Sequence, residues 1–187
     1  MAPSRQLRAR PPLDSRRLEE LALRYVGRYA TSRAKLAGYL ARKVRERGWA
    51  DDRDPDFDRL INRFSELGYV DDAAYALAKS QVLTSRGYGK RRVEERLRQA
   101  QIGEAEGTAA REHANENAVD AALRFAERRR IGPFGEADRD PKKREKAIGA
   151  MIRAGHSFAL ARTIVDWPAD CALQKQEIAY RAGLTLS

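Results

Sequence analysis

The sequence is poor in the side chains that most often carry chemistry. Its 187 residues include one cysteine, Cys171, and two histidines, His113 and His156, which lie far apart in the chain. A single cysteine excludes an internal disulfide and a cysteine-rich metal cluster. Two isolated histidines are a weak basis for a metal site or for histidine-dependent catalysis. We therefore expect no metal and no cofactor, and we expect both histidines to have surface or packing roles.

Long apolar runs are also missing. No run approaches the roughly 18 residues that a membrane-spanning helix needs. The first 13 residues contain three prolines and three arginines, without the apolar core of a signal peptide. We expect a cytoplasmic protein with no membrane partner.

Charge, in contrast, is abundant. Charged residues make up 34% of the chain, and 37 Lys and Arg against 27 Asp and Glu give a net charge of +10. An excess of this size predicts attraction to polyanions such as nucleic acid or an acidic protein surface. The high charged fraction is typical of helices with long solvated faces.

The apolar residues follow a helical period from Leu18 onward, and no stretch shows sustained strand-like alternation. Similar segments recur about every 50 residues, with Tyr25, Tyr75 and Phe125 as equivalent aromatic positions. A second anchor, a turn after a helix, recurs at a similar period and is marked by Gly48, Gln101 and Gly155. Two independent anchors with one period favour three related units.

We predict an all-α fold of three tandem three-helix repeats that form an elongated, curved array. The expected segments are a mobile basic arm (1–14), three repeats (15–69, 70–115 and 116–167) and a C-terminal tail (168–187). The expected helices span 15–29, 32–47 and 57–67, then 72–86, 89–100 and 104–115, then 116–130, 141–153 and 157–167. The weakest is 104–115, which is small and polar, and the tail could form one more helix.

Several positions are expected to face the core or to shape the turns. The expected core positions include Tyr69, Tyr75, Leu97 and Phe125. In the helix over 72–86, Tyr75, Ala78 and Val82 fall on one face. Asp71 or Asp72 is expected first as a helix cap and second as a functional pair.

Two stretches resemble ligand loops but lack the required pattern. "GYGK" at 87–90 lacks the earlier glycine, the following Ser or Thr and the preceding strand of a nucleotide-binding loop. Gly87 and Gly89 are better explained as the end of one helix and the start of the next. The acidic stretch at 51–58 lacks the glycine and the final glutamate of a calcium loop. No catalytic triad motif is present, so we expect no enzyme.

Basic residues gather at the start of the second helix in each predicted repeat. They are Arg33 and Lys35, then Lys90, Arg91 and Arg92, then Lys142, Lys143 and Arg144, and Arg86, at the end of the preceding helix, is a further candidate binding residue. Cations oppose the helix dipole at this end at a cost of roughly 0.3–1 kcal/mol each. Helix N-termini also offer free N–H groups to anions. The placement therefore predicts phosphate or carboxylate binding, with ordinary solvated helix faces as the alternative.

The segment "FSELGYVDDAAYALAKSQVLTSRGYGKRRVEERLRQAQI" at 64–102 resembles the central part of the RecX family, bacterial regulators of the RecA recombinase. The matching motif residues are Leu67, Gly68, Tyr69, Val70, Asp71 and Asp72, then Tyr75 and Ala76, then Arg86, Gly87 and Gly89, with Val93 and Leu97 in the basic helix. The first and last units resemble the opening and closing patterns of the family, so the resemblance covers about 18–167. The stretch 103–117 departs from it, because the apolar spacing of a helix is missing there.

The resemblance implies a monomeric, non-enzymatic protein that acts in homologous recombination, DNA repair and the SOS response. It implies binding in the groove of the RecA–DNA filament, with inhibition of ATP hydrolysis, strand exchange and filament growth. The implied partners are the RecA filament and single- and double-stranded DNA. The alternative from the residues themselves is a helical DNA-binding protein, sequence-specific or nonspecific, with a helix–turn–helix around Gly87–Gly89. A DNA-processing enzyme is a third possibility.

Overall fold

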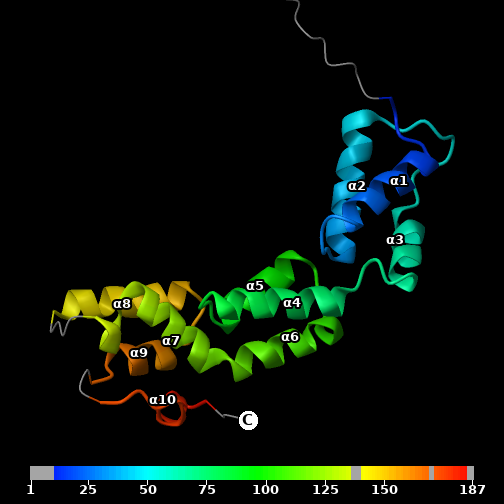
Figure 1. Cartoon of the computed structure of the whole chain (residues 1–187). Helices are drawn as coiled ribbons and strands as arrows, with labels where there is room; N and C mark the ends of the chain where they lie inside the picture. Colours follow the sequence, from blue (N-terminus) through cyan, green and yellow to red (C-terminus); the bar gives the residue numbers. More distant parts are fainter. Residues whose placement is uncertain (1–10, 136–139, 169–170, 185–187) are drawn as a thin grey trace, which may run out of the picture. The chain divides into compact units, whose positions relative to one another are not determined.

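The computed structural model describes residues 11–135, 140–168 and 171–184, and within these ranges the chain is all-helical (Figure 1). The helices are α1 (Ser15–Val26), α2 (Arg33–Arg47), α3 (Phe57–Glu66), α4 (Asp72–Ser85), α5 (Lys90–Gln99), α6 (Glu104–Glu116), α7 (Ala118–Arg129), the 3-10 turn η1 (Gly132–Phe134), α8 (Pro141–Arg153), α9 (Phe158–Val165) and α10 (Lys175–Arg181). The chain divides into two compact units, Met1–Asp72 and Ala73–Ser187. The predicted all-α class is confirmed.

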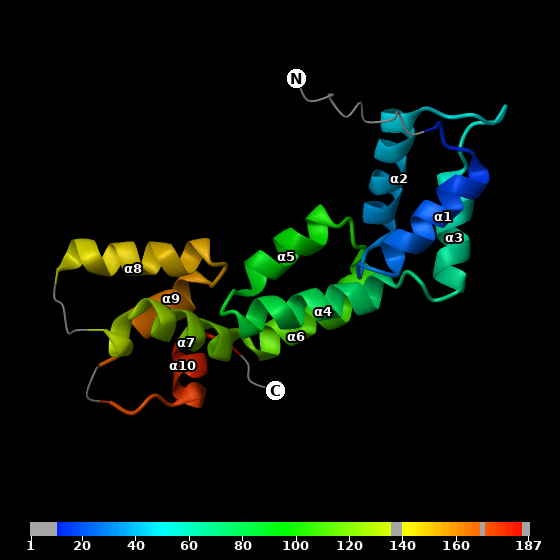
Figure 2. The same cartoon turned by 45° about the horizontal axis from the view of Figure 1, so that its top comes forward.

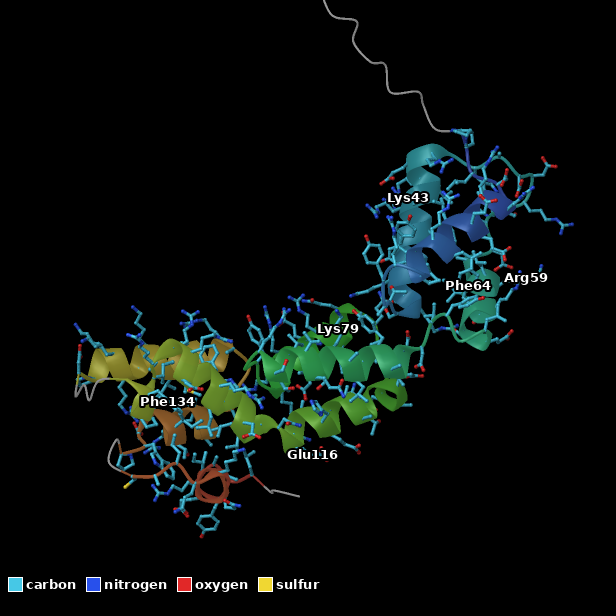
Figure 3. All side chains as sticks on the ribbon, in the orientation of Figure 1. Lys43, Arg59, Phe64, Lys79, Glu116 and Phe134 are labelled. Carbon is cyan, nitrogen blue, oxygen red and sulfur yellow. The ribbon has the colours of Figure 1, made fainter. Side chains whose placement is uncertain are left out.

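The first unit is built from α1, α2 and α3, which lie side by side in Figures 1 and 2. Side chains of Asp14, Ser32 and Asp56 accept hydrogen bonds from backbone N–H groups in the first turns of these three helices. Such caps fix where each helix begins. Phe64, labelled in Figure 3, is the largest fully buried side chain here. It packs with the other buried residues Leu13, Leu18, Ala22, Leu36, Leu40, Ile61 and Val70.

The described part of the predicted N-terminal arm belongs to this unit. Residues 1–10 lie outside the described residues, but Leu13 is fully buried. Its N–H donates to the Gly48 carbonyl at 3.0 Å, and its carbonyl accepts from the Ala50 N–H at 2.8 Å. Asp51 accepts from both the N–H and the hydroxyl of Ser15, which lowers the pKa of that carboxyl. The chain is therefore held in place from before the first helix.

In the second unit, α4, α5 and α6 share one small core. Its buried residues are Tyr75, Ala76, Val93, Leu97, Ala100, Ile102, Ala110 and Ala114. The buried face of α6 consists of Gly107, Ala110 and Ala114. Small residues at this spacing let a full helix of 13 residues pack closely without large apolar side chains. The stretch 103–117 therefore lacks the usual apolar pattern and is nevertheless helical.

The buried face of α4 differs from the predicted one. Ala78 and Val82 are exposed, whereas Ser80 and Thr84 are buried. The Ser80 hydroxyl donates to the Ala110 carbonyl of α6 at 2.7 Å, and the Thr84 hydroxyl donates to the Ser80 carbonyl at 3.0 Å. Hydroxyls that find partners can be buried at little cost. The prediction from apolar spacing alone was therefore wrong about which face of α4 is buried.

Helices α7 to α10 form the larger core of this unit. Its buried residues include Phe125, Met151, Leu160, Ile164, Trp167 and Ile178. The predicted C-terminal tail contributes α10, which packs against α7 and α9. Lys175 of α10 pairs with Asp120 of α7 at 2.5 Å, and the Arg181 guanidinium lies 4.9 Å from the Trp167 ring centre. The tail therefore closes one side of this core.

Of the four expected core residues, Tyr75, Leu97 and Phe125 are buried, but Tyr69 is 52% exposed. The Tyr69 ring meets Phe64 edge-on at 5.6 Å, so it covers the core of the first unit from outside. Gly68 before it has φ 73°, which ends α3 in the left-handed conformation that glycine favours. The Asp72 carboxylate accepts from the Arg33 N–H of α2 at 2.8 Å, so Asp72 helps to cap α2.

Two glycine turns meet inside the second unit. The Gly89 N–H, just before α5, donates to the Ala154 carbonyl at 3.0 Å, and the Arg91 N–H donates to the Gly155 carbonyl at 3.1 Å. A Cβ atom on Gly89 would stand 2.4 Å from the Gly155 oxygen, and one on Gly155 would stand 2.6 Å from the Arg92 nitrogen. Only glycine on both sides allows two backbones to come this close. We call this contact the glycine joint.

The glycine joint yields a stability prediction. Replacing Gly89 by Ala forces a shift against a backbone oxygen, and overpacking of this kind costs roughly 1–3 kcal/mol. We expect the unfolding free energy of G89A to fall by about this amount in urea titrations.

The control is G149A in α8 of the same unit, where the added Cβ meets only the flexible end of Arg153 at 3.3 Å. Alanine in a helix interior is favoured over glycine by roughly 0.5–1 kcal/mol. G149A should therefore be neutral or stabilising, and equal losses in both variants would contradict the importance of the joint.

Candidate anion-binding groove

A groove of about 950 Å³ opens on the second unit beside the glycine joint. It lies between the turn that joins α4 to α5, helix α7 and helix α8. The basic residues that line it are Arg86, Arg128, Arg129, Lys143, Lys146 and Arg153. The remaining lining residues are Tyr88, Phe125, Ile131, Ala147, Ala150 and Ala154. The groove thus has an apolar floor and a basic rim.

One face of α8 forms a wall of this groove. Lys146 and Ala147 lie three and four residues after Lys143, and Ala150 and Arg153 follow Ala147 at intervals of three, so the five share a side of the helix. Alanines in the middle of this face leave space for a ligand, and the longer cations stand at its two ends and edge. The opposite side of α8 carries the buried residues Ile148 and Met151.

The rim cations are held in position by the backbone and by aromatic rings. The Arg128 guanidinium donates to the Arg86 carbonyl at 2.6 Å, which ties α7 to the turn after α4. The guanidinium carbons of Arg128 and Arg129 lie 5.7 and 5.9 Å from the Phe125 ring centre, within the range of a cation–π contact. These contacts order the side chains and leave their positive charge uncompensated by a carboxylate.

Among the residues that the structure describes, no carboxylate lines the groove. Charges of one sign along a low-dielectric wall concentrate the field and raise the local concentration of an oppositely charged ligand. Phosphate and carboxylate groups are therefore the ligands that this site is built to attract, and the apolar floor can accept an aliphatic or aromatic part beside them.

Two predicted binding residues, Arg86 and Lys143, lie in this groove. The α5 cations lie next to it: the Arg92 guanidinium is 5.9 Å from the ring centre of Tyr88 and donates to Glu95 at 2.7 Å. Lys90 pairs loosely with Glu94 at 3.9 Å, and the Arg91 side chain is exposed.

The start of α8, where Lys142 lies, is far from the start of α5. The glycine joint places α5 against the C-terminal end of α8, and 13 helical residues span about 18 Å. The two basic helix starts therefore do not form one continuous cluster.

Arg144 has a structural role. Its guanidinium donates from Nε and Nη2 to both carboxylate oxygens of Asp166, each at 2.6 Å. The forked hydrogen bonds raise the pKa of Arg144 and lower that of Asp166. They join α8 to the end of α9, so this cation is already paired.

In the first unit, Arg33 is similarly engaged. Its side chain donates to the Ser65 hydroxyl at 2.8 Å and to the Asn62 side chain. Lys35, two residues further along α2, is exposed. Arg33 therefore joins α2 to α3, and the structure assigns it a contact within the protein.

The helix starts also differ from the expectation of free N–H groups. At α5 the Arg91 N–H donates to Gly155, at α2 the Arg33 N–H donates to Asp72, and at α8 the Lys142 N–H donates to Asp140. Protein acceptors thus occupy donors that an anion would use. Attraction for anions must come from the side chains of the groove.

His156 follows the glycine joint and is buried. Its Nε2–H donates to the Gly87 carbonyl at 3.1 Å, while Nδ1 has no partner among the described residues. Burial lowers the pKa of His156 to about 4, and the hydrogen bond to Gly87 opposes this shift only in part. The imidazole is therefore neutral at pH 7 and acts in packing, as the sequence predicted.

The sequence-based reasoning missed Arg128, Arg129, Lys146 and Arg153 as groove residues. A signal was present in α8, where cations flank alanines on one helical face, from Lys143 to Ala154. The prediction rested on cations at helix starts and did not include cations along one side of a helix. The α7 cations carried no such signal, because only the packing of α7 beside α8 makes them part of a site.

Within the described ranges, no group of three or more His, Cys, Asp or Glu side chains could hold a metal ion. No helix in this part of the chain is long and apolar enough to cross a membrane.

Within the described ranges the fold is all-helical, and its second unit carries a groove rimmed by cations. The chain is 29% identical over 166 residues to the Regulatory protein RecX of Myxococcus xanthus (strain DK1622), covering 80% of this chain and 84% of that protein. It is 26% identical over 136 residues to the Regulatory protein RecX of Agrobacterium fabrum (strain C58 / ATCC 33970), covering 70% of this chain and 72% of that protein. No family model matches the chain. The two relatives confirm the resemblance to the RecX family and support assignment of the chain to it.

His156 predicts a pH dependence of stability. Between pH 6.5 and about 4 the unfolded chain binds a proton at this imidazole that the folded chain excludes. The contribution to stability is therefore complete above pH 6.5 and is lost as the pH falls toward 4, with a size of about 3 kcal/mol. Urea unfolding at several pH values measures it.

Replacing His156 by Gln should flatten this part of the profile, even if the variant is less stable at pH 7. A parent profile that is already flat in this window would contradict the burial of a neutral His156.

Proposed function

We propose that this protein is a non-enzymatic regulator that binds the RecA nucleoprotein filament and inhibits its ATPase activity, strand exchange and growth. The observation that carries the proposal is the six-cation groove of the second unit, on a chain whose curated relatives are both named Regulatory protein RecX. The filament offers two anionic surfaces, DNA phosphate and acidic recombinase side chains. Either is compatible with a basic rim.

The residues that line the groove support contacts to phosphate or carboxylate groups rather than to base edges. Its lining has charged donors but no Asn or Gln side chain of the kind that distinguishes one base edge from another. Arg and Lys at the rim would position a phosphate chain or a carboxylate-rich segment without reading its sequence. Binding of this kind is strongly dependent on salt, because counterions are released.

The three tandem three-helix repeats belong to this proposal. Support comes from the turns that follow the second helix of each predicted repeat. Gly48, Gln101 and Gly155 occupy these turns, and all three have positive φ values of 83°, 53° and 99°. A positive φ is uncommon outside glycine, and Gln101 and Gly155 each directly follow the C-cap residue of the second helix of their repeat. Gly48 is itself the C-cap of α2 and has ψ 169°, so it is the recurrence of positive φ, and not one shared conformation, that favours related units.

The helix–turn–helix alternative receives less support. Such a module presents the N-terminal residues of its second helix to the bases of the major groove. Here the start of α5 donates Arg91 N–H to Gly155, and Gly87 and Gly89 in the turn are buried. The backbone at the start of α5 is thus hydrogen-bonded to another turn of the same unit, while the side chains of Lys90 and Arg91 are exposed.

Reversing two groove charges tests the proposal. In the variant R129E/K146E, we expect at least about tenfold weaker inhibition of the DNA-dependent ATPase of RecA, because two favourable contacts become repulsive. Co-sedimentation with RecA filaments on single-stranded DNA should weaken in parallel. If phosphates are the ligands, the salt dependence of binding should decrease by about one unit of slope for each lost contact.

The matched control is R96E/R98E on α5, which changes the net charge equally at exposed positions outside the groove. Circular dichroism and urea midpoints check that both variants fold. Inhibition that is unchanged in R129E/K146E would overturn the role of the groove. Equal losses in both variants would show that net charge alone is responsible.

A further inference from the structure

A second hollow, on the first unit, combines aromatic rings with arginines. Its volume is about 940 Å³, and it lies over α1, the turn that follows it, and α2. Three tyrosines and three arginines line it: Tyr25, Tyr29, Tyr39, Arg24, Arg28 and Arg42. Within the part of the chain that the structure describes, no carboxylate is among its lining residues. This composition differs from that of the groove on the second unit, where the rings are few and the cations many.

The three tyrosines form a connected set of rings. Tyr25 and Tyr39 stack with ring centres 4.2 Å apart and planes inclined by 18°, which joins α1 to α2. Tyr29 is tilted by 50° against Tyr25 at 5.3 Å. The Tyr29 N–H donates to the Tyr25 carbonyl at 3.0 Å, so the turn that ends α1 fixes where this ring stands.

The three rings differ in how far they are buried. Tyr25 and Tyr39 are partly buried against the core of the first unit, whereas Tyr29 is 57% exposed. A tyrosine needed only for packing would be covered on both faces. Tyr29 therefore offers an aromatic surface to solvent next to a stack that is already rigid.

Cations surround the rings in contact range. The Arg42 guanidinium and the Lys43 ammonium lie 5.7 and 5.9 Å from the Tyr39 ring centre, and Figure 3 labels Lys43 on α2. Arg24 pairs only loosely with Glu20, at 3.8 Å. Arg28, beside Tyr29, is exposed and forms no ion pair within the described ranges.

We propose that this hollow binds unstacked bases of a single-stranded nucleic acid, with Tyr29 as the stacking surface and Arg28 and Arg24 as phosphate contacts. Stacking on aromatic side chains beside a basic track is the usual way in which proteins hold single strands without reading their sequence. An acidic peptide would use the cations but would have no use for an exposed ring face. The proposal is independent of RecA and of the groove on the second unit.

The test compares an oligothymidylate with an abasic oligonucleotide of the same length and charge, bound to the full chain alone. For Y29A we expect roughly tenfold weaker binding to the oligothymidylate and little change for the abasic strand, because one stacked base is lost. Y29F keeps the ring and should bind as the parent does. R28A should weaken binding to both strands, because phosphates are common to them.

The control variant is Y180A, which removes a tyrosine that is 82% exposed on α10, outside the hollow. Photo-crosslinking with a strand that contains 5-iodouracil should label the tryptic peptide 29–33. Equal binding by Y29A and the parent overturns the proposal, as does an equal loss on both strands. Competition by polyglutamate that is stronger than competition by the abasic strand would indicate an acidic protein segment as the occupant.

The outcome is separate from that of the regulatory proposal. R129E/K146E should inhibit RecA less than the parent does. Adding Y29A to this variant should still weaken binding to the oligothymidylate more than binding to the abasic strand. If Y29A inhibits RecA as the parent does but loses base-dependent binding to single strands, both proposals stand.

Discussion

The glycine joint is the contact on which the second unit depends. Two turns, one before α5 and one after α8, meet backbone to backbone, with Gly89 and Gly155 facing each other and His156 donating to Gly87. The contact has no side chain at its centre, so its geometry is set by hydrogen bonds alone. It fixes Arg86 and Tyr88 beside the C-terminal half of α8. The basic groove exists because these segments cannot move apart without breaking that set of bonds.

The neutral state of His156 follows from the same constraint. A buried imidazole with one hydrogen bond to a carbonyl is stable only without a proton, because the charged form would lose its hydration without gaining a carboxylate partner. His156, whose pKa is lowered by burial, is therefore a packing residue. A shifted pKa often marks a functional site, but here the geometry assigns it to the fold.

Much of the fold could be predicted from the sequence, because local signals decide it. Asp14, Asp56 and Ser157 cap the starts of α1, α3 and α9, and periodic apolar residues follow each of them along the helix. Errors arose where the buried face was not apolar. In α4 the Ser80 hydroxyl is buried because the Ala110 carbonyl of α6 accepts from it, and the Thr84 hydroxyl is buried because the Ser80 carbonyl of its own helix does. No local pattern of apolar residues contains that information.

The candidate sites were harder to predict, because they depend on which side chains remain unpaired. Arg144 and Arg33 looked like binding residues in the sequence, but Asp166 and Ser65 engage them. Arg129 and Lys146 come from different helices and share a site only through packing. Similarly, Tyr25 and Tyr39 belong to separate helices, and their stacking is a result of how α1 meets α2.

A contact made only of backbone has a consequence for how such a protein can change over evolutionary time. Side chains at Gly89 or Gly155 would separate the turns, so we expect related chains to keep both glycines together or to lose the joint entirely. The groove beside it has no such restriction, because its rim consists of long surface side chains. Single substitutions at the rim can therefore change the affinity of the groove and its anionic partner, while the backbone contact that supports the groove stays the same.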